Sequence, residues 1–376
     1  MPISRRAIMF GVGAALGAPR YVLSAEKSHV DSASKPVREL LATNTVPALS
    51  VAVMRGSDLL WAEAFGKVNI ELDVAATPAH RFRLGSVSKV VTATLTATLA
   101  ARGIVDLDAP IVRYLSDLPE QHHATTLQQL LTHRGGIRHY LPKDEARAEP
   151  GPIDLRQYPT TADVLAVFIN DPLVAKPGER VSYSTFGYTL ASLVIEAAAK
   201  TPFLELVQRE IAKPLGLESL GGDTQIALVP DRVSGYQPGD TVRKAQPDFK
   251  GVYGNVPPAN VAYKWAGGGL LATATDLAKF GAAHLTAGRI PAAALKVLFT
   301  VHTQATSDSP PLGLGWRINE DNKQRLRWHH AGGQLGARAS IVVYPHERLS
   351  IAFATNVTGI PGNTNELSAQ IADAFV

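Results

Sequence analysis

The residues of this chain best suited to covalent chemistry are Ser86 and Lys89, in the segment Gly85-Ser86-Val87-Ser88-Lys89. Side chains three residues apart on a helix share one face, so the amine of Lys89 can reach the hydroxyl of Ser86. A serine whose proton is taken by a nearby amine can attack a carbonyl carbon without help from a histidine. The spacing therefore predicts a serine nucleophile that forms an acyl-enzyme.

The setting of this pair is more specific than its spacing, because Ser24 to Lys27 and Ser32 to Lys35 have the same spacing in polar sequence. After Ser86 the chain is largely apolar and contains neither glycine nor proline before Gly103. This run predicts a helix over Val87 to Ala101 with Ser86 in its first turn, where free backbone N–H groups favour negative charge on oxygen. The alternative is that the Ser86 hydroxyl only caps the helix.

Three further segments contain residues that could take part in the same reaction, and they follow Ser86 along the chain. A tyrosine, Tyr183, stands where a loop is expected to meet a helix. The glycines in Trp265-Ala266-Gly267-Gly268-Gly269-Leu270 are expected to allow a tight backbone turn before a helix capped near Thr275. The segment Trp328-His329-His330-Ala331-Gly332-Gly333 leads into the last strands of the chain.

In this order the segments resemble the serine β-lactamase and penicillin-binding protein superfamily, class C-like, whose motifs are Ser-x-x-Lys, Tyr-x-Asn and Lys/His-x-Gly. The resemblance spans about residues 46–355. Three longer phrases are most similar to the LACTB-like branch, the mitochondrial serine β-lactamase-like proteins: Gly136 to Tyr140, Tyr183 to Tyr188 and Tyr263 to Gly269. Such phrases are far longer than the short motifs, so the resemblance is specific.

The resemblance implies roles for particular residues. Ser86, Lys89 and Tyr183 are expected to be catalytic, with Lys89 and Tyr183 sharing the removal of the serine proton. The backbone N–H groups of Ser86 and Gly333 are expected to form an oxyanion hole. His330 is expected to hydrogen-bond Tyr183 or a substrate carboxylate. Thr185, Ala331 and Gly332 complete the expected substrate-binding set.

Two departures from the superfamily pattern bear on the substrate. Thr185 replaces asparagine and so removes an amide that both donates and accepts hydrogen bonds, and Ala331 replaces the usual threonine and so removes a hydroxyl. Both changes weaken recognition of a penicillin-like acylamide. The LACTB resemblance implies a peptidase with a capacity to polymerise.

The interpretation is a serine hydrolase acting on a peptide or small-molecule amide. Esterase or weak β-lactamase activity is the alternative. A hypothesis of another class is a scaffold with a lactamase-like fold, non-catalytic or filament-forming.

Composition narrows the remaining classes. The 376 residues, 45% hydrophobic and 19% charged, are typical of a globular chain. There are no cysteines, and no histidine motif gathers a catalytic metal, so neither a metal nor a cofactor is expected. Without the three arginines of residues 1–25, which contain no acid, the net charge falls from +4 to +1. This balance argues against a nucleic-acid partner.

The first 25 residues predict an export signal. Arg5-Arg6 precedes an apolar block from Ala7 to Ala18, the pattern of a twin-arginine signal cleaved near Ala25, and the mature chain is then expected in the periplasm. The block is shorter than the roughly 20 residues of a membrane span, so no stable span is expected in the mature form. A disordered or anchoring N-terminus is the alternative.

Strands are predicted at both ends of the chain: Ala48 to Met54, Leu59 to Gly66, Arg338 to Tyr344 and Leu349 to Thr355. A polar linker to about residue 35 and a helix over Val37 to Ala42 precede them, and a helix over Asn365 to Phe375 closes the chain. Between these ends, helices are predicted at Val87 to Ala101, Thr126 to Thr132, Thr161 to Phe168, Tyr188 to Ala199, Phe203 to Ile211 and Thr275 to Leu285.

This order predicts an α+β sandwich, in which both termini build one antiparallel sheet flanked by helices and the middle of the chain forms a mostly helical inserted subdomain. The expected division is a leader over residues 1–25 and one hydrolase domain over 26–376. Its sheet part covers about 36–85 and 310–376, and its helical part about 86–309. The long loops at about 140–160 and 223–262 are expected to wall a binding cleft. Arg138 and His139 are interpreted as structural. Lys264 and Trp265 are expected to line the cleft, and for Trp265 the core is the alternative.

Overall fold

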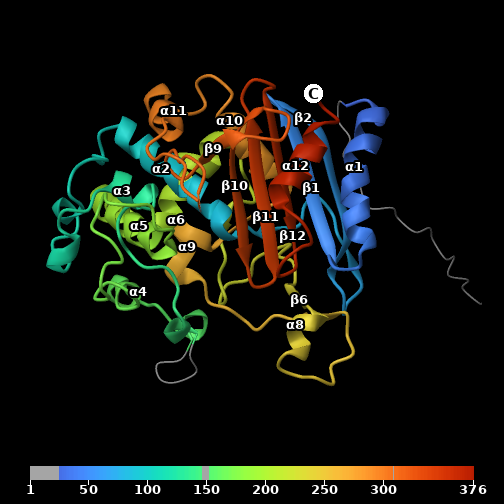
Figure 1. Cartoon of the computed structure of the whole chain (residues 1–376), viewed down its shortest axis with the longest axis horizontal. Coiled ribbons are helices and arrows are strands. Elements are labelled where there is room, and N and C mark those ends of the chain that lie inside the picture. Colours follow the sequence, from blue (N-terminus) through green and yellow to red (C-terminus); the bar gives the residue numbers. More distant parts are fainter. Residues whose placement is uncertain (1–24, 146–151, 308) are drawn as a thin grey trace, which may run out of the picture.

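The computed structural model describes residues 25–145, 152–307 and 309–376, and one seven-stranded antiparallel sheet dominates it (Figure 1). Within these residues the strands lie in the order β3-β2-β1-β12-β11-β10-β9. Strand β1 (Ala48–Arg55) pairs with β12 (Leu349–Thr355), and Leu49 lies opposite Thr355. The two ends of the chain therefore share one sheet, and the predicted α+β fold is confirmed.

The other strands of this sheet are β2 (Asp58–Asn69), β3 (Val74–Ala75), β9 (Arg317–Glu320), β10 (Leu326–Gln334) and β11 (Ala337–Tyr344). A small three-stranded sheet has the order β4 (Phe82–Arg83), β8 (Leu270–Ala272) and β5 (Gly221–Gly222). A small two-stranded sheet consists of β6 (Tyr236–Pro238) and β7 (Tyr253–Asn255). The helices are α1 (Lys27–Ala42), α2 (Ser88–Ala101), α3 (Leu127–Leu131), α4 (Thr161–Leu165), α5 (Thr185–Ala199), α6 (Phe203–Leu206), α7 (Lys213–Leu215), α8 (Gly239–Arg243), α9 (Trp265–Gly268), α10 (Ala274–Ala283), α11 (Ala292–Phe299) and α12 (Thr364–Ala372).

Helices cover both faces of the large sheet. Helices α1 and α12 pack on one face, on the right in Figure 1, and bury alternate residues of β1 that include Leu49, Val51 and Val53. The intervening alanines of β1 face α10 on the other side. At Gly281 of α10 a Cβ would lie 2.2 Å from the Ser350 hydroxyl of β12, so only glycine permits this close approach. The alternation expected of strands is thus what separates the two cores.

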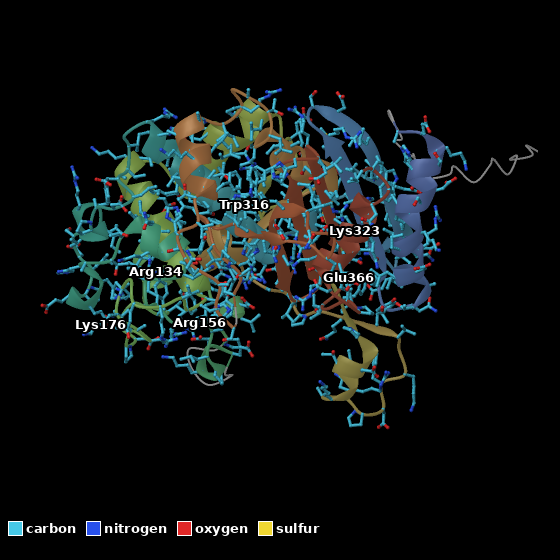
Figure 2. All side chains as sticks on the ribbon, turned by 45° about the horizontal axis from the view of Figure 1, so that its top comes forward. Arg134, Arg156, Lys176, Trp316, Lys323 and Glu366 are labelled. Carbon is cyan, nitrogen blue, oxygen red and sulfur yellow. The ribbon has the colours of Figure 1, made fainter. Side chains whose placement is uncertain are left out.

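Helices α2, α3, α4, α5, α6 and α9 lie beyond the β9 edge of the sheet (Figure 1). Figure 2 shows Trp316, which is fully buried, in the middle of the molecule where this helical side meets the sheet. Helix α2 packs against both α5 and α9 there. The first turn of α2 therefore lies between the helical side and the end of β10.

The predicted polar linker up to residue 35 is wrong, because α1 already begins at Lys27. Its buried residues are Val30, Ala33, Ser34 and Val37, which have the spacing of one helix face. The polar composition and Pro36 obscured this pattern. Tertiary packing against α12 and the sheet outweighs the cost of a proline inside the helix.

The elements that were not predicted include strands β9 and β10 and helix α11. Strand β10 contains the segment His330 to Gly333, which was expected to precede the strands and instead lies within one. Its glycines and histidines have low strand propensity, and β10 is held by pairing with β11 on one side and β9 on the other.

Within the described residues, no helix has the length and apolar content that crossing a bilayer requires. The predicted export signal covers residues 1–25, of which residues 1–24 lie outside the described part of the chain.

Candidate active site

Ser86 lies in a short 3₁₀ turn, Gly85–Val87, that leads directly into α2. Gly85 has a φ of +50°, a conformation that residues with a Cβ rarely adopt. The Ser88 hydroxyl links the turn to β8 by accepting a hydrogen bond from the backbone N–H of Leu270 at 3.1 Å. The residue before α2 is Val87, and the Ser86 hydroxyl does not cap the helix. That hydroxyl is instead directed at two other side chains.

The first of these is Lys89, one turn along α2 and fully buried. Its Nζ lies 3.1 Å from Ser86 Oγ, 3.1 Å from Thr185 Oγ1 and 2.6 Å from the backbone oxygen of Gly267. Burial lowers the pKa of the Lys89 amine from its ordinary value of 10.5, although the neighbouring Tyr183 acts in the opposite direction. The amine is therefore biased toward the neutral form that a base requires.

The second is Tyr183, whose hydroxyl donates to Ser86 Oγ at 2.8 Å. Tyr183 lies two residues before α5, at the loop-to-helix junction that the sequence predicts, and Ser184 caps this helix by accepting from the N–H of Gly187. Lys89 Nζ also lies 4.8 Å from the centre of the Tyr183 ring. Residues 97 positions apart thus converge on one serine oxygen.

The end of β10 packs directly against the turn that carries Ser86. A Cβ on Gly332 would lie 1.9 Å from the backbone oxygen of Leu84, and a Cβ on Gly85 would lie 2.7 Å from the backbone nitrogen of Gly333. Only glycines allow the two backbones to approach this closely. The contact brings the Gly333 N–H to the turn of Ser86, where the sequence predicts an oxyanion hole.

His330 lies on β10, where it is buried, and it lines a cavity together with Tyr183. Its Nδ1 lies 2.7 Å from the backbone oxygen of Ala331. Within the described residues, the His330 side chain is hydrogen-bonded to this backbone oxygen. The hydrogen bond to Tyr183 that the sequence led us to expect is not formed there. Burial first, and then the charges of Arg317 and Lys89, hold the pKa of His330 well below 6.5. The ring is therefore a neutral wall of the site.

Ser86 opens into a cavity of about 470 Å³ that both long loops help to wall. Residues 152–155 and 257–259 line it, together with Thr185 and Lys264. Lys264 is buried and pairs with Asp154 at 3.2 Å, which ties the two loops together. Trp265 lies behind this wall, with its indole N–H donating to the backbone oxygen of Asp223.

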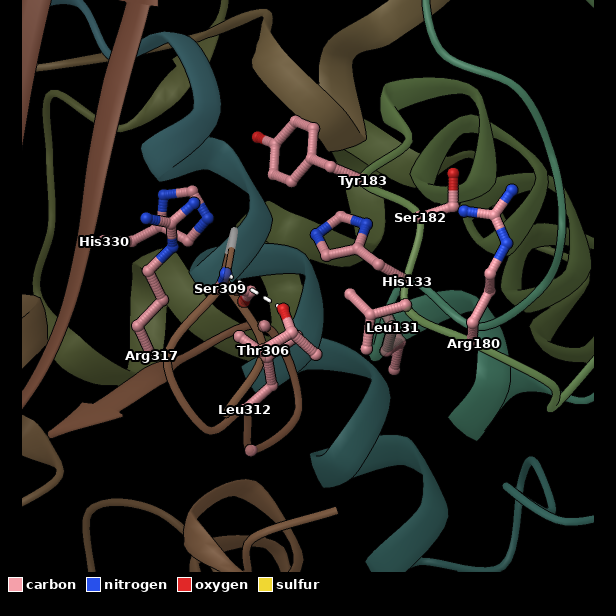
Figure 3. Close-up of a pocket in the computed structure, with 13 residues that line it drawn as sticks. Leu131, His133, Arg180, Ser182, Tyr183, Thr306, Ser309, Leu312, Arg317 and His330 are labelled. Carbon is pink, nitrogen blue, oxygen red and sulfur yellow. Dashed lines mark hydrogen bonds between the residues drawn. The ribbon is translucent and has the colours of Figure 1, made fainter. Parts of the chain in front are cut away.

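A second cavity of about 470 Å³ is lined in part by Tyr183 (Figure 3). Among the residues that the structure describes, its lining includes the arginines Arg180 and Arg317 and the histidines His133 and His330. In Figure 3 the Arg317 and His330 side chains lie next to each other across the cavity from His133. Tyr183 of this cavity contacts Ser86, which lines the other cavity, and the described lining residues of the two cavities differ in charge.

The structure requires glycine in the Trp265 segment for a different reason from the tight turn that the sequence predicts. None of Gly267, Gly268 and Gly269 has a positive φ, so a tight turn does not require them. A Cβ on Gly267 would instead lie 2.7 Å from the Thr185 methyl group. Glycine here lets the backbone oxygen reach Lys89.

Sequence reasoning missed His133 and Arg317, and it interpreted His139 only as structural. His139 lines the Ser86 cavity, and His133 and Arg317 line the basic one. Arg138 is structural as interpreted, since it is buried and pairs with both Asp144 and Asp171. His139 stood in a phrase shared with relatives, which was the available signal. No group of side chains able to hold a metal ion occurs among the described residues.

Comparison with known proteins agrees with this geometry. The model of the family described as Beta-lactamase matches residues 34–375. The human serine beta-lactamase-like protein LACTB, mitochondrial, is 26% identical, over 80% of this chain and 69% of its own length. Esterase EstB from Burkholderia gladioli is 27% identical, over 60% of this chain and 62% of its own length.

Solved structures share the fold. The octameric penicillin-binding protein homologue from Pyrococcus abyssi superposes with a TM-score of 0.76 at 24% identity, over 92% of this chain and 76% of that one. At this identity the likeness supports the fold alone.

Proposed function

The chain belongs to the beta-lactamase family, and from this premise we propose that it is a serine hydrolase that cleaves a peptide or small amide through an acyl-enzyme on Ser86. One observation carries the proposal: Ser86 Oγ lies 3.1 Å from the Lys89 amine and 2.8 Å from the Tyr183 hydroxyl. Both groups are within the reach that proton transfer requires.

The contacts of Lys89 suit a neutral amine. A neutral amine has two N–H donors and one lone pair, and two acceptors, the Gly267 backbone oxygen and Thr185 Oγ1, surround it in addition to Ser86. With the N–H groups on those acceptors, the lone pair faces the serine hydroxyl. Lys89 then takes the serine proton as Oγ bonds to the substrate carbonyl carbon, with Tyr183 in contact with the same oxygen.

Charge on the carbonyl oxygen would be met by the N–H groups of Ser86 and Gly333, each such donor contributing about 100- to 1000-fold in rate. The leaving amine would take a proton through Tyr183 or Lys89, and water would then release the acyl group. His330, Ala331 and Gly332 would support this side of the site, with Gly332 needed for the close approach of β10.

The basic cavity favours a substrate with a carboxylate on its leaving group. Arg317 and Arg180 line the basic cavity together with Tyr183, and His330 stays neutral there. An arginine presents a planar fork of donors that matches a carboxylate. This arrangement supports a peptidase acting near a free C-terminus over an esterase acting on an uncharged alcohol.

Esterase or weak β-lactamase activity is the second candidate, and the relative named Esterase EstB supports it. The candidate of another class is a scaffold without turnover that binds peptides or forms filaments. Against it stands the burial of Lys89, whose lowered pKa and loss of hydration destabilise the folded chain without benefit to a scaffold.

Labelling with a fluorophosphonate probe, followed by mass spectrometry of the modified peptide, tests the nucleophile. We expect modification at Ser86 in the wild type and none in Ser86→Ala. The matched control is Ser32→Ala, since Ser32 and Lys35 repeat the same spacing on an exposed face of α1. Labelling that persists in Ser86→Ala would remove the proposed nucleophile. Hydrolysis rates across peptides with free and amidated C-termini, esters and lactams would then rank the substrates.

We also propose that the chain is exported through its N-terminal arginine pair and that copies of it associate. The arginine pair and apolar block support export, and the octameric structural neighbour makes association reasonable to test. N-terminal sequencing of the protein from a periplasmic fraction, and sedimentation of the purified chain, would test the two statements separately.

A further inference from the structure

Two histidines hold the segment that carries Tyr183, and no role in the reaction has so far been given to either. The backbone oxygen of His133 accepts the N–H of Ser182 at 2.7 Å, and its Nδ1 accepts the N–H of Ser184 at 3.1 Å. The residues directly before and after Tyr183 are thus both bonded to one residue. His139 Nδ1 lies 3.3 Å from the next N–H, that of Thr185.

The same two rings pack against the Tyr183 side chain. The His133 and Tyr183 ring centres are 4.3 Å apart, and the His139 ring meets Tyr183 edge-on at 5.3 Å. Figure 3 shows His133 beside Tyr183 at the wall of the basic cavity. His133 itself has a φ of +58°, an uncommon conformation for a residue with a Cβ. Such backbone strain persists where the surroundings fix a residue in place.

Each ring can accept these hydrogen bonds only while its Nδ1 carries no proton. For His133, burial first, and then the charges of Lys89, His330, Arg317 and His139, hold the pKa well below 6.5.

For His139, burial and the charges of Lys89, Lys264 and Arg138 lower the pKa to about 4, against an opposing effect of Asp144. Both rings therefore remain acceptors throughout the neutral range.

We propose that His133 and His139 are positioning residues for the reaction: as neutral acceptors they fix the backbone on both sides of Tyr183 and so hold its hydroxyl on Ser86 Oγ. This inference rests on the proposed function. Its physical basis is that the Tyr183 hydroxyl must stay within hydrogen-bond reach of the serine, and a displacement of about 1 Å at a reacting group can lower the rate about 100-fold.

The test compares asparagine and leucine at each position, because these side chains have nearly the same shape and only asparagine offers an acceptor close to the place of Nδ1. We expect the maximal rate of Ser86 modification by a fluorophosphonate probe to fall about 10- to 100-fold in His133→Leu and His139→Leu, with the half-saturating probe concentration within about twofold of wild type. His133→Asn and His139→Asn should stay within about threefold of wild type.

His346→Leu, in the exposed turn between β11 and β12, is the matched control and should change nothing. Thermal unfolding reports whether each variant is folded. Leucine is strained at the positive φ of position 133, so the pair at position 139, which lacks that strain, decides the matter if His133→Leu fails to fold.

Equal losses in the Asn and Leu variants, or a loss confined to probe affinity, would show that the rings only fill space and would overturn the positioning role. A wild type that is not modified at Ser86 would instead overturn the proposed function itself, so the two failures are distinguishable.

Discussion

At the scale of single residues, the protonation of Lys89 governs the chemistry in the proposed mechanism. Its amine must be neutral to take the serine proton, and burial favours that form by lowering the pKa from 10.5. Acylation should therefore increase with pH through the lowered pKa and reach a plateau above it. The buried amine also makes the folded chain bind fewer protons than the unfolded chain between the two pKa values, so this group's effect on stability likewise improves as the pH rises.

Lys89→Arg is the sharpest test of the neutral amine, because arginine stays charged at every accessible pH. We expect a loss of about 100- to 10,000-fold in the acylation rate, the usual contribution of a general base. The pH profile of the fluorophosphonate reaction should then lose its rising limb. An arginine variant that keeps both rate and profile would show that Lys89 is not the base.

Much of the site could be predicted at this scale, and the reason is local. Ser86 and Lys89 are separated by one helical turn, so their contact follows from helix geometry alone. Tyr183 was found only through its phrase and the order of motifs. Arg317 had no local signal, since it reaches the site only through the pairing of β9 with β10.

At the scale of elements, the first turn of α5 sets the place of Tyr183. Ser184 accepts from the N–H of Gly187 and donates to the backbone oxygen of Arg138 at 2.8 Å. The residue therefore both caps a helix and ties it to the loop that carries His139.

Ser184→Ala should lower the free energy of unfolding by about 0.5–2 kcal/mol, the usual cost of losing such a cap. It should also slow the acylation of Ser86, because Tyr183 directly precedes the lost cap. Thr160→Ala removes the cap of α4, away from the serine, and should reduce stability without changing the rate. If both variants change the acylation rate of Ser86 equally, the cap at Ser184 has no specific effect on Tyr183.

The contact of β10 with the Ser86 turn gives a second prediction. Gly332→Ala would place a methyl group 1.9 Å from the Leu84 backbone oxygen, so the strand and the turn must separate. We expect a loss of about 1–3 kcal/mol in stability together with slower acylation. Gly221→Ala, where a Cβ would meet open space, is the control and should leave both denaturant unfolding and labelling close to wild type.

The predicted elements agree best with the structure where the hydrophobic pattern is regular and the paired strands are neighbours in the sequence. Strands β1, β2, β11 and β12 alternate clearly or are continuously apolar, and their turns carry the expected residues, such as Gly56 at a φ of +56°. Strand β10 was missed because its motif glycines serve the contact with Ser86 at the expense of strand propensity.

At the scale of the whole molecule, two hydrophobic cores lie on opposite faces of one sheet, and of the two only the core opposite α1 and α12 contains residues of α2. The core under α1 and α12 contains Ile371 and Phe353, both fully buried, and lies on the face away from α2. A change there should affect how much of the protein is folded and leave the site of the folded molecules unaltered.

Ile371→Ala should lower the free energy of unfolding by about 2–5 kcal/mol, as for other large side chains truncated in a core. The labelling rate per folded molecule should remain that of wild type, as measured after correction for the folded fraction. Leu228→Ala is the control, since Leu228 is 97% exposed, and its unfolding midpoint should not move. A rate change in folded Ile371→Ala would show that the two cores are coupled.

The neighbourhood of β1 and β12 has a consequence for biosynthesis. Leu49 lies opposite Thr355, so a ribosome must translate the 306 residues from 50 to 355 before this pair of strands, β1 and β12, can form. Until then the β1–β2 hairpin exposes an apolar edge, which is a target for aggregation or for chaperones. Contacts between such distant positions also slow folding, so newly made chains should acquire protease resistance late and almost all at once.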